Sequence, residues 1–297
     1  MDIGNLEKGI LYALMAGIIW GVGPLLLKRG MALSNVSTAT LVQQYSCVTY
    51  LVLLAAFRGE LRMGGLSATA FWCFVLAGSI GATVGRISLY KGIDRVGASK
   101  SITIKNSAPL LTVVIGVLVL GEALTLPIVA GVALIVTGVF LLSRMVGGKG
   151  SSSYPTRYLF YPLIAAFCFG LNPILKKIGL SDVSLPVLGT LVTQSTALIL
   201  ILTVGRLMNI KPRWEPVPWP GLLLFIATGV IEGTGSVFTF YALSYGPAIL
   251  VSPIWRIQPL VTYVLANFTL KGIEVVTMRD GVAALFIVGG VFVLSRG

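Results

Sequence analysis

The sequence contains no histidine and few charged residues. None of its 297 residues is His, and only 11% are charged. Histidine is the commonest metal ligand and general base in proteins, so its absence argues against a metal centre and against most hydrolytic enzymes. Soluble domains carry about 25% charged residues. A separate soluble catalytic or nucleic-acid-binding domain is therefore excluded.

Cysteine is also scarce. The three cysteines, Cys47, Cys73 and Cys168, all lie within apolar runs, and no two of them form a CxxC pair. Thiols in such surroundings are more often small packing residues than metal ligands or disulfide partners. We therefore expect no metal and no cofactor, and we expect that the protein is not an enzyme.

Apolar residues fill most of the chain. Hydrophobic residues make up 56% of it, and the mean hydropathy is +0.94. A membrane-spanning helix takes about 20 apolar residues, and runs of this length recur without the period-two alternation of a β-barrel. We expect an all-α integral membrane protein with ten transmembrane helices near residues 9–27, 38–57, 69–90, 99–120, 125–143, 158–176, 184–205, 218–243, 248–270 and 278–295.

The two halves of the chain repeat one another. Residues Gly21–Lys28 match Gly170–Lys177, and Phe140–Arg144 match Phe292–Arg296, in the same order. A stretch rich in Gly and Ser, typical of a flexible linker, lies between the halves. We expect a first five-helix repeat over residues 1–146, a linker over 147–157 and a second five-helix repeat over 158–297.

An odd number of spans in each repeat has a geometric consequence. The second copy must enter the membrane from the opposite side, so a pseudo-two-fold axis in the membrane plane relates the two copies. Many secondary transporters have this architecture, with the substrate site near the midplane between the repeats. The pattern favours a transporter over a sensor or a scaffold protein.

Short motifs recur at equivalent places in the two halves. The first helix ends in a Gly-x-x-Pro motif at Gly21–Pro24, Leu120–Thr125 reads LGEALT, and Glu274 lies at the position equivalent to Glu122. Together these motifs resemble the EamA-type permeases of the drug/metabolite transporter superfamily. The resemblance implies a ten-helix bundle around a central cavity, alternating access without ATP hydrolysis, and metabolite export among the activities of its members.

Four charged residues lie well inside the expected helices: Arg86, Lys105, Glu232 and Arg256. A charge at the bilayer centre costs at least ~2.5–3.5 kcal/mol, so these side chains should face protein or water. One structural alternative is an ion pair between Glu232 and Arg256. Three cations against one anion leave an excess of positive charge, which solvent anions or an anionic substrate must balance.

Two of these cations precede prolines. Lys105 comes four residues before Pro109, and Arg256 comes three before Pro259. Proline bends a helix and leaves backbone carbonyls for water or polar groups, so we expect the two segments to form walls of one polar cavity. Pro24 and Pro173 are expected to bend the first helix of each repeat. A Lys before Pro in the fourth helix also resembles the sugar-phosphate branch, although the ninth helix lacks that branch's Lys-Arg pair.

These residues lead to a hypothesis for the substrate site. Lys105 and Arg256 hold the negative group of the substrate, and Arg86 assists them, because Arg suits bidentate contacts and Lys acts as a point charge. The other members of the expected site are hydrogen-bond partners, aromatic contacts and a proton-coupling or ion-pair residue: Asn106, Gln258, Tyr90, Tyr241, Trp20 and Glu232.

The expected function is secondary transport of a small anionic or zwitterionic metabolite, such as an amino acid, an organic acid or a sugar phosphate. Protons or an exchanged counter-substrate are the expected coupling partners, and a monomer is sufficient. The alternative is a flippase for a lipid-linked anionic or sugar substrate, which needs a cavity open sideways to lipid. Basic residues are more numerous on the face opposite the termini, which favours external termini, whereas the resemblance implies cytoplasmic termini in a cell (inner) membrane.

Overall fold

The protein is helical throughout the part of the chain that the computed structural model describes. These residues are 3–61, 65–96, 98–143, 155–207, 216–269 and 278–296, and none of them lies in a β-strand. The first half contains α1 (Ile3–Met31), α2 (Val36–Phe57), α3 (Ala68–Ala77), the π-helical segment η2 (Gly78–Gly85), α4 (Arg86–Val96), α5 (Ala98–Lys105), α6 (Ala108–Leu120) and α7 (Leu126–Ser143). The second half contains the 3-10 turn η3 (Thr156–Leu159), α8 (Phe160–Asp182), α9 (Pro186–Leu207), α10 (Trp219–Tyr245), α11 (Ala248–Ile254), the 3-10 turn η4 (Trp255–Ile257), α12 (Gln258–Thr269) and α13 (Met278–Leu294).

Many of these helices have the length and composition of membrane spans. Seven in the described part of the chain are long and apolar enough to cross a membrane: Gly4–Met31, Thr38–Phe57, Ala68–Val96, Arg157–Asp182, Pro186–Thr203, Trp219–Tyr245 and Ala248–Leu265. Three further apolar helices are shorter: Ala108–Leu120, Leu126–Leu141 and Gly281–Leu294. All ten ranges expected from the sequence contain helix. Because a helix satisfies its own backbone hydrogen bonds, it is suited to hydrocarbon, and the chain is a multi-pass membrane protein.

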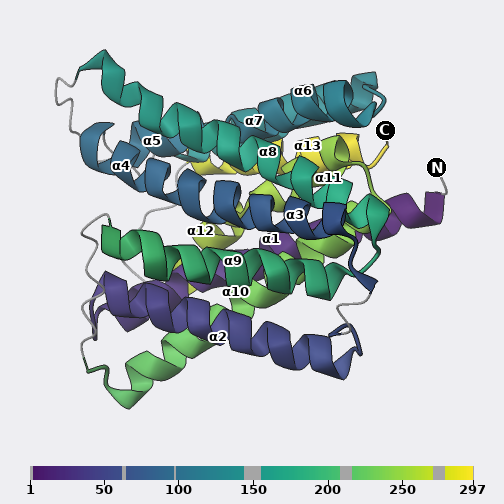
Figure 1. Cartoon of the computed structure of the whole chain (residues 1–297). Helices are drawn as coiled ribbons and strands as arrows, with labels where there is room; N and C mark the ends of the chain where they lie inside the picture. The colour runs from purple at the N-terminus through teal and green to yellow at the C-terminus, as the bar shows by residue number, and fades with distance from the viewer. Residues whose placement is uncertain are drawn as a thin grey trace.

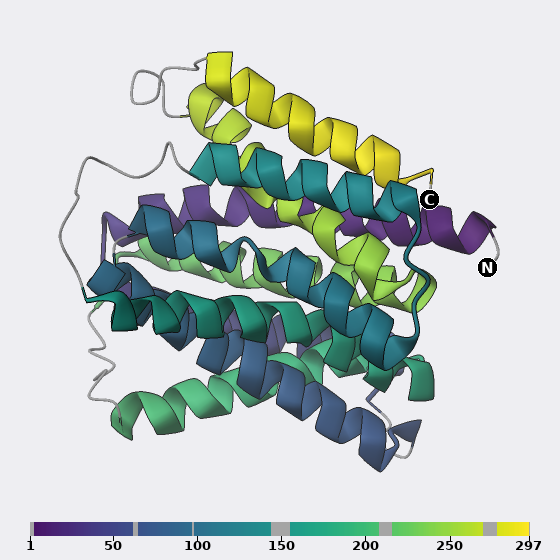
Figure 2. The ribbon, with the colours of Figure 1, turned by 90° about the horizontal axis from the view of Figure 1, so that it is seen from above.

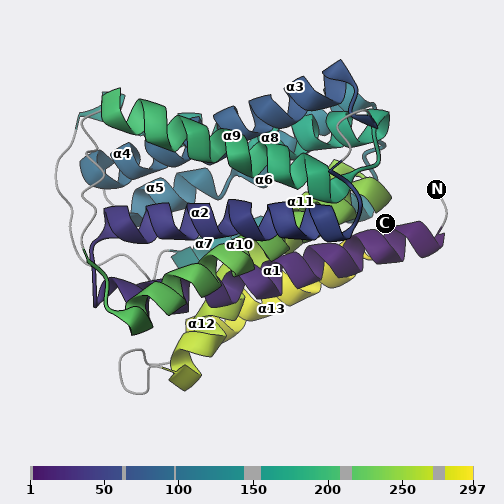
Figure 3. The same cartoon turned by 60° about the horizontal axis from the view of Figure 1, so that its bottom comes forward.

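The helices run side by side, and both chain ends lie at the same end of the bundle (Figure 1). We call this end the terminal face; the connections that follow α2, α6, α8 and α10 lie there, and the other end is the opposite face. Figure 3 shows α10 between α1 and α2, both of which it contacts. Helices of the first and second halves are thus interleaved rather than packed as two separate bodies.

Close packing of glycines joins α7 to α13, which lie side by side (Figure 2). A Cβ atom added at Gly131 would lie 2.8 Å from the carbonyl oxygen of Gly290, and one at Gly290 would lie 2.7 Å from that of Gly131. One at Gly138 would lie 2.7 Å from the carbonyl oxygen of Ala283. Small residues bring helix backbones together in this way in membranes, where packing replaces the hydrophobic effect.

Three helical runs lose their regular α-helical geometry partway through the bundle. One is η2; the second is the turn at Asn106-Ser107 between α5 and α6; the third is η4, between α11 and α12. Pro109 and Pro259 are the second residues of the helices that follow the last two breaks, α6 and α12. Proline has no backbone N–H, so each leaves the preceding turn without its usual helical bond. Pro24 and Pro173 lie inside the continuous helices α1 and α8.

Candidate functional site

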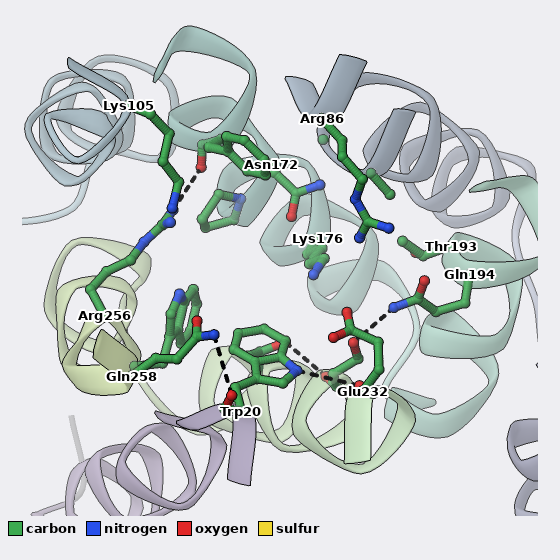
Figure 4. Close-up of a pocket in the computed structure, with 17 residues that line it drawn as sticks. Trp20, Arg86, Lys105, Asn172, Lys176, Thr193, Gln194, Glu232, Arg256 and Gln258 are labelled. Atoms are coloured by element: carbon green, nitrogen blue, oxygen red, sulfur yellow. Dashed lines mark hydrogen bonds between the residues drawn. The ribbon is translucent and has the colours of Figure 1, made fainter. Parts of the chain in front are cut away.

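A polar cavity of about 200 Å³ lies where these irregular segments meet. Its walls come from α1, η2, the first residue of α4, the end of α5, α8, α9, α10, η4 and the start of α12. Both halves of the chain contribute, and their side chains converge on one space (Figure 4). Pockets for drug-sized ligands measure about 300–1,000 Å³, so this cavity suits a smaller molecule.

Lys105 and Arg256 reach toward one another at one wall of the cavity (Figure 4). Both lie over the ring of Phe169, with Lys105 Nζ 5.4 Å and Arg256 Cζ 5.9 Å from its centroid. A terminal nitrogen of Arg256 donates a 3.4 Å hydrogen bond to the Phe169 carbonyl oxygen, while its Nε has no partner in the described part of the protein. Two converging cations repel one another unless an anion lies between them, so this wall favours an anionic group.

Arg86 enters the cavity directly after the π-helical segment. Gly81 and Ala82 of η2 line the same wall. This segment packs against α8, where Asn172 Nδ2 donates a 2.7 Å hydrogen bond to the carbonyl oxygen of Ala77. A Cβ atom at Gly81 would collide with the Asn172 side chain. π-helical turns occur often at functional sites, and this one brings Arg86 to the cavity.

Glu232 has the only carboxylate among the described residues that line the cavity. Its backbone carbonyl accepts a 3.4 Å hydrogen bond from Trp20 Nε1, and the Trp20 carbonyl accepts one of 3.2 Å from Gln258 Nε2. No described cation lies within 4.0 Å of the carboxylate. The ion pair between Glu232 and Arg256 that the sequence offered as an alternative is therefore not formed in this structure.

Lys176 lines the cavity and was missed by the sequence interpretation, which ended the helix at this residue. The helix α8 continues to Asp182, so Lys176 lies inside the bundle, with its Nζ 4.9 Å from the centre of the Phe240 ring. In Figure 4 it lies on the same side of the cavity as Glu232, opposite Lys105 and Arg256. The apolar residues that follow the Lys176-Lys177 pair are the signal that would have extended the helix.

Neutral polar residues of α8, α9 and α10 complete the cavity and were also missed. Gln194 Nε2 donates a 2.8 Å hydrogen bond to Ser236 Oγ, and Gln194 Oε1 accepts one of 3.1 Å from Gln44 Nε2. Asn172 and Thr193 lie on the same lining. Amides within apolar runs were the available signal, because a buried amide is costly without hydrogen-bond partners.

Two members of the expected site lie outside this cavity. Asn106 is buried at the break between α5 and α6. Tyr241 lies nine residues beyond Glu232, roughly 14 Å farther along α10 at the helical rise. Its hydroxyl accepts a 3.0 Å hydrogen bond from Arg58, and its ring stacks on Tyr12 with centroids 5.2 Å apart. The side chain of Tyr90 lies outside the described residues.

A carboxylate joins the two halves at the terminal face. Gly121 ends α6 in a left-handed conformation, with φ of 63°, which glycine adopts without strain. The next residue, Glu122, accepts hydrogen bonds of 2.6 and 2.9 Å from the backbone N–H groups of Ala248 and Ile249. The carboxylate therefore caps the first turn of α11, where a negative charge is favoured.

Two further charged residues join helix ends at the same face. Glu60, from the connection after α2, accepts hydrogen bonds of 3.1 and 3.0 Å from the N–H groups of Val187 and Leu188 in the first turn of α9. Lys177 donates hydrogen bonds of 2.5 and 2.9 Å to two carbonyl oxygens at the end of α10. Charged side chains thus hold the helix ends together between the cavity and the terminal face.

The match to a family model decides the classification. The model of the EamA-like transporter family matches residues 7–144 and, a second time, residues 156–296. The chain belongs to the EamA-like transporter family. Each half of this EamA-like protein carries one copy of the family repeat, and the resemblance to the drug/metabolite transporter superfamily is thereby confirmed.

Two relatives match parts of this EamA-like chain. An uncharacterised protein of Pseudomonas aeruginosa is 29% identical over 134 residues, which cover 43% of this chain and 45% of that protein. The match thus spans less than half of that relative. An uncharacterised protein of Methanocaldococcus jannaschii is 22% identical over 138 residues, which cover 46% of this chain and 98% of that protein. The archaeal relative therefore has about the length of one repeat.

A solved structure shares the fold. The crystal structure of another protein superimposes with a TM-score of 0.74 at 17% identity, covering 96% of this chain and 94% of the other. At this level of identity the similarity shows the fold alone.

Proposed function

We propose that this EamA-like protein is a secondary transporter that moves a small anionic or zwitterionic metabolite by alternating access, without ATP hydrolysis. An amino acid, an organic acid or a sugar phosphate is of suitable size. The observation that carries the proposal is the cavity of about 200 Å³, to which both halves contribute charged groups. Secondary transporters with repeated halves bind their substrates at such an interface.

The proposed architecture is ten spans in two inverted repeats, over residues 1–146 and 158–297, joined by the linker 147–157. The chain order supports the inversion. The first half begins at the terminal face and, with α7, ends at the opposite face, whereas the second half begins there and ends at the terminal face (Figure 1). The archaeal relative, with about the length of one repeat, supports a duplicated unit.

In the proposed site, Lys105 and Arg256 hold the negative group of the substrate, and Arg86 contributes a third charge. Trp20 and Gln258 line the cavity beside them and offer an aromatic face and an amide. Glu232 is the proposed proton-coupling residue, because its carboxylate faces the cavity without an ion-pair partner among the described cations. An exchanged counter-substrate is the alternative coupling partner.

One copy of the chain is sufficient for this mechanism, since a single copy supplies both walls of the cavity. We place the protein in a cell (inner) membrane, in keeping with its family.

Transport by purified protein in liposomes tests the proposal. Counterflow of amino acids, organic acids and sugar phosphates is screened with wild-type protein, and Lys105→Gln and Arg256→Gln are then compared with it. Removing a charged hydrogen-bond partner costs about 1.5–3 kcal/mol, so each variant is expected to lower kcat/KM at least about tenfold. Lys91→Gln removes an exposed charge of α4 as a control. Unchanged transport in both cavity variants would contradict the proposed site.

A further inference from the structure

We propose that the substrate carries two separate acidic groups, as a short dicarboxylate does, rather than one. The inference rests on the proposed function, because it takes the cavity to be the substrate site. Among the described residues that line the cavity, four carry a positive charge and Glu232 alone carries a negative one. A substrate with one negative charge would leave most of this excess unbalanced.

The cations form two groups. Lys105 and Arg256 converge at one wall over Phe169, whereas Lys176 and Arg86 stand across the cavity from them (Figure 4). The Nζ of Lys176 lies over a different ring, that of Phe240, at 4.9 Å from its centroid. The positive charge thus has two centres, at separate walls. A substrate with two acidic groups held apart by a short carbon chain can reach both centres, whereas one compact anion cannot.

These four cations form few direct hydrogen bonds or ion pairs with the described part of the protein. In the described part of the chain, the side chains of Arg86, Lys105 and Lys176 donate no hydrogen bond and form no ion pair. Arg256 has one weak acceptor, the carbonyl oxygen of Phe169 at 3.4 Å. Charged groups withdrawn from bulk water need counter-charges and hydrogen-bond acceptors. A substrate with a carboxylate at each pair of cations supplies the counter-charges and the hydrogen-bond acceptors.

A zwitterion fits this arrangement less well. Its ammonium group has only the Glu232 carboxylate to pair with among the described lining residues. Lys176 and Arg86 stand on the same side of the cavity as that carboxylate (Figure 4), and they would repel a second cation brought there.

Equilibrium binding to the purified protein tests the inference with three probes of similar size and different charge, and with a fourth that carries two charges in a compact form. Succinate carries two carboxylates, succinamate has one replaced by an amide, and succinamide has both replaced; sulfate is a compact dianion. We expect succinate to bind at least about tenfold more tightly than succinamate, because one charged contact is lost, and more tightly than sulfate. Succinamide is expected to bind weakest.

Substitutions of the lining lysines test which wall of the cavity binds the second acidic group. Lys176→Gln is expected to remove most of the preference for succinate over succinamate, and Lys176→Arg to restore it. Lys105→Gln is expected to weaken both acids, whereas Lys91→Gln, which removes an exposed charge of α4, leaves all four affinities unchanged. Thermal unfolding of each variant shows whether it folds.

The outcomes separate this inference from the proposed function. Equal binding of succinate and succinamate, tighter binding of sulfate than of succinate, or no binding of any probe would overturn the two-acid inference. Liposomes that exchange serine but not succinate would overturn it too, while leaving transport established. Selective succinate binding with no counterflow of any screened metabolite would contradict transport instead.

Discussion

The charge of the cavity depends on one residue more than on any other. Glu232 is its only carboxylate among the described lining residues, so Glu232→Gln removes a repulsion between the protein and an anionic substrate. At an effective dielectric near 20, two charges roughly 8–10 Å apart interact by about 2 kcal/mol. We expect succinate to bind roughly thirtyfold more tightly to Glu232→Gln, because each 1.4 kcal/mol changes an affinity about tenfold; calorimetry measures the change. Weaker binding would mean that Glu232 orders the surrounding cations instead.

The charged residues of the cavity were largely predictable one by one. Arg86, Lys105, Glu232 and Arg256 stand out because a charge within an apolar run is costly in a membrane, and the structure brings all four to one cavity. Lys176 was missed because the predicted helix ended there. Neutral amides such as Gln194 gave a weaker signal, since their cost depends on hydrogen-bond partners that sequence position does not reveal.

At the scale of helices, the apolar runs predicted where the helices lie. In hydrocarbon, a backbone segment must satisfy its own hydrogen bonds, and a helix does so. The breaks before Pro109 and Pro259 were predictable from proline chemistry. The π-helical segment η2 was not predictable in this way, because it contains no proline. It packs against Asn172 of α8, whose side chain donates a hydrogen bond to the carbonyl oxygen of Ala77, 95 residues away in the sequence. Such irregularities depend on tertiary contacts rather than on local sequence.

Adjacent glycines in α13 test the packing of that helix on α7. A Cβ atom at Gly290 would lie 2.7 Å from the carbonyl oxygen of Gly131 and 2.9 Å from the backbone nitrogen of Ile135, whereas one at Gly289 meets nothing within 4 Å. Overpacking costs about 1–3 kcal/mol, so Gly290→Ala is expected to lower the thermal unfolding temperature. Gly289→Ala should leave it unchanged or raise it, since Ala favours helix by about 1 kcal/mol. Equal effects of the two variants would contradict this packing.

For the whole molecule, the contacts at the terminal face bear on which side of the cavity is closed. Glu122 and Glu60 belong to the first half, and each caps a helix of the second. Alternating access requires the halves to separate at one face and then at the other. In the proposed alternating-access mechanism, these charged caps therefore hold the two halves together at the terminal face, and opening that face must break them.

Weakening one cap is expected to shift the population toward molecules open at the terminal face. In Glu122→Gln a neutral amide replaces the carboxylate that accepts hydrogen bonds from Ala248 and Ile249, and a loss of about 1.4 kcal/mol changes the ratio of the two states tenfold. The readout is a cysteine placed at Thr239, which is buried and lines the cavity, in a chain without its native cysteines. An impermeant thiol reagent added at the terminal face should label it about tenfold faster in Glu122→Gln. Glu7→Gln removes an exposed acid at the same face and should leave the rate unchanged. If Glu122→Gln labels no faster than this control, the cap does not hold the terminal face shut.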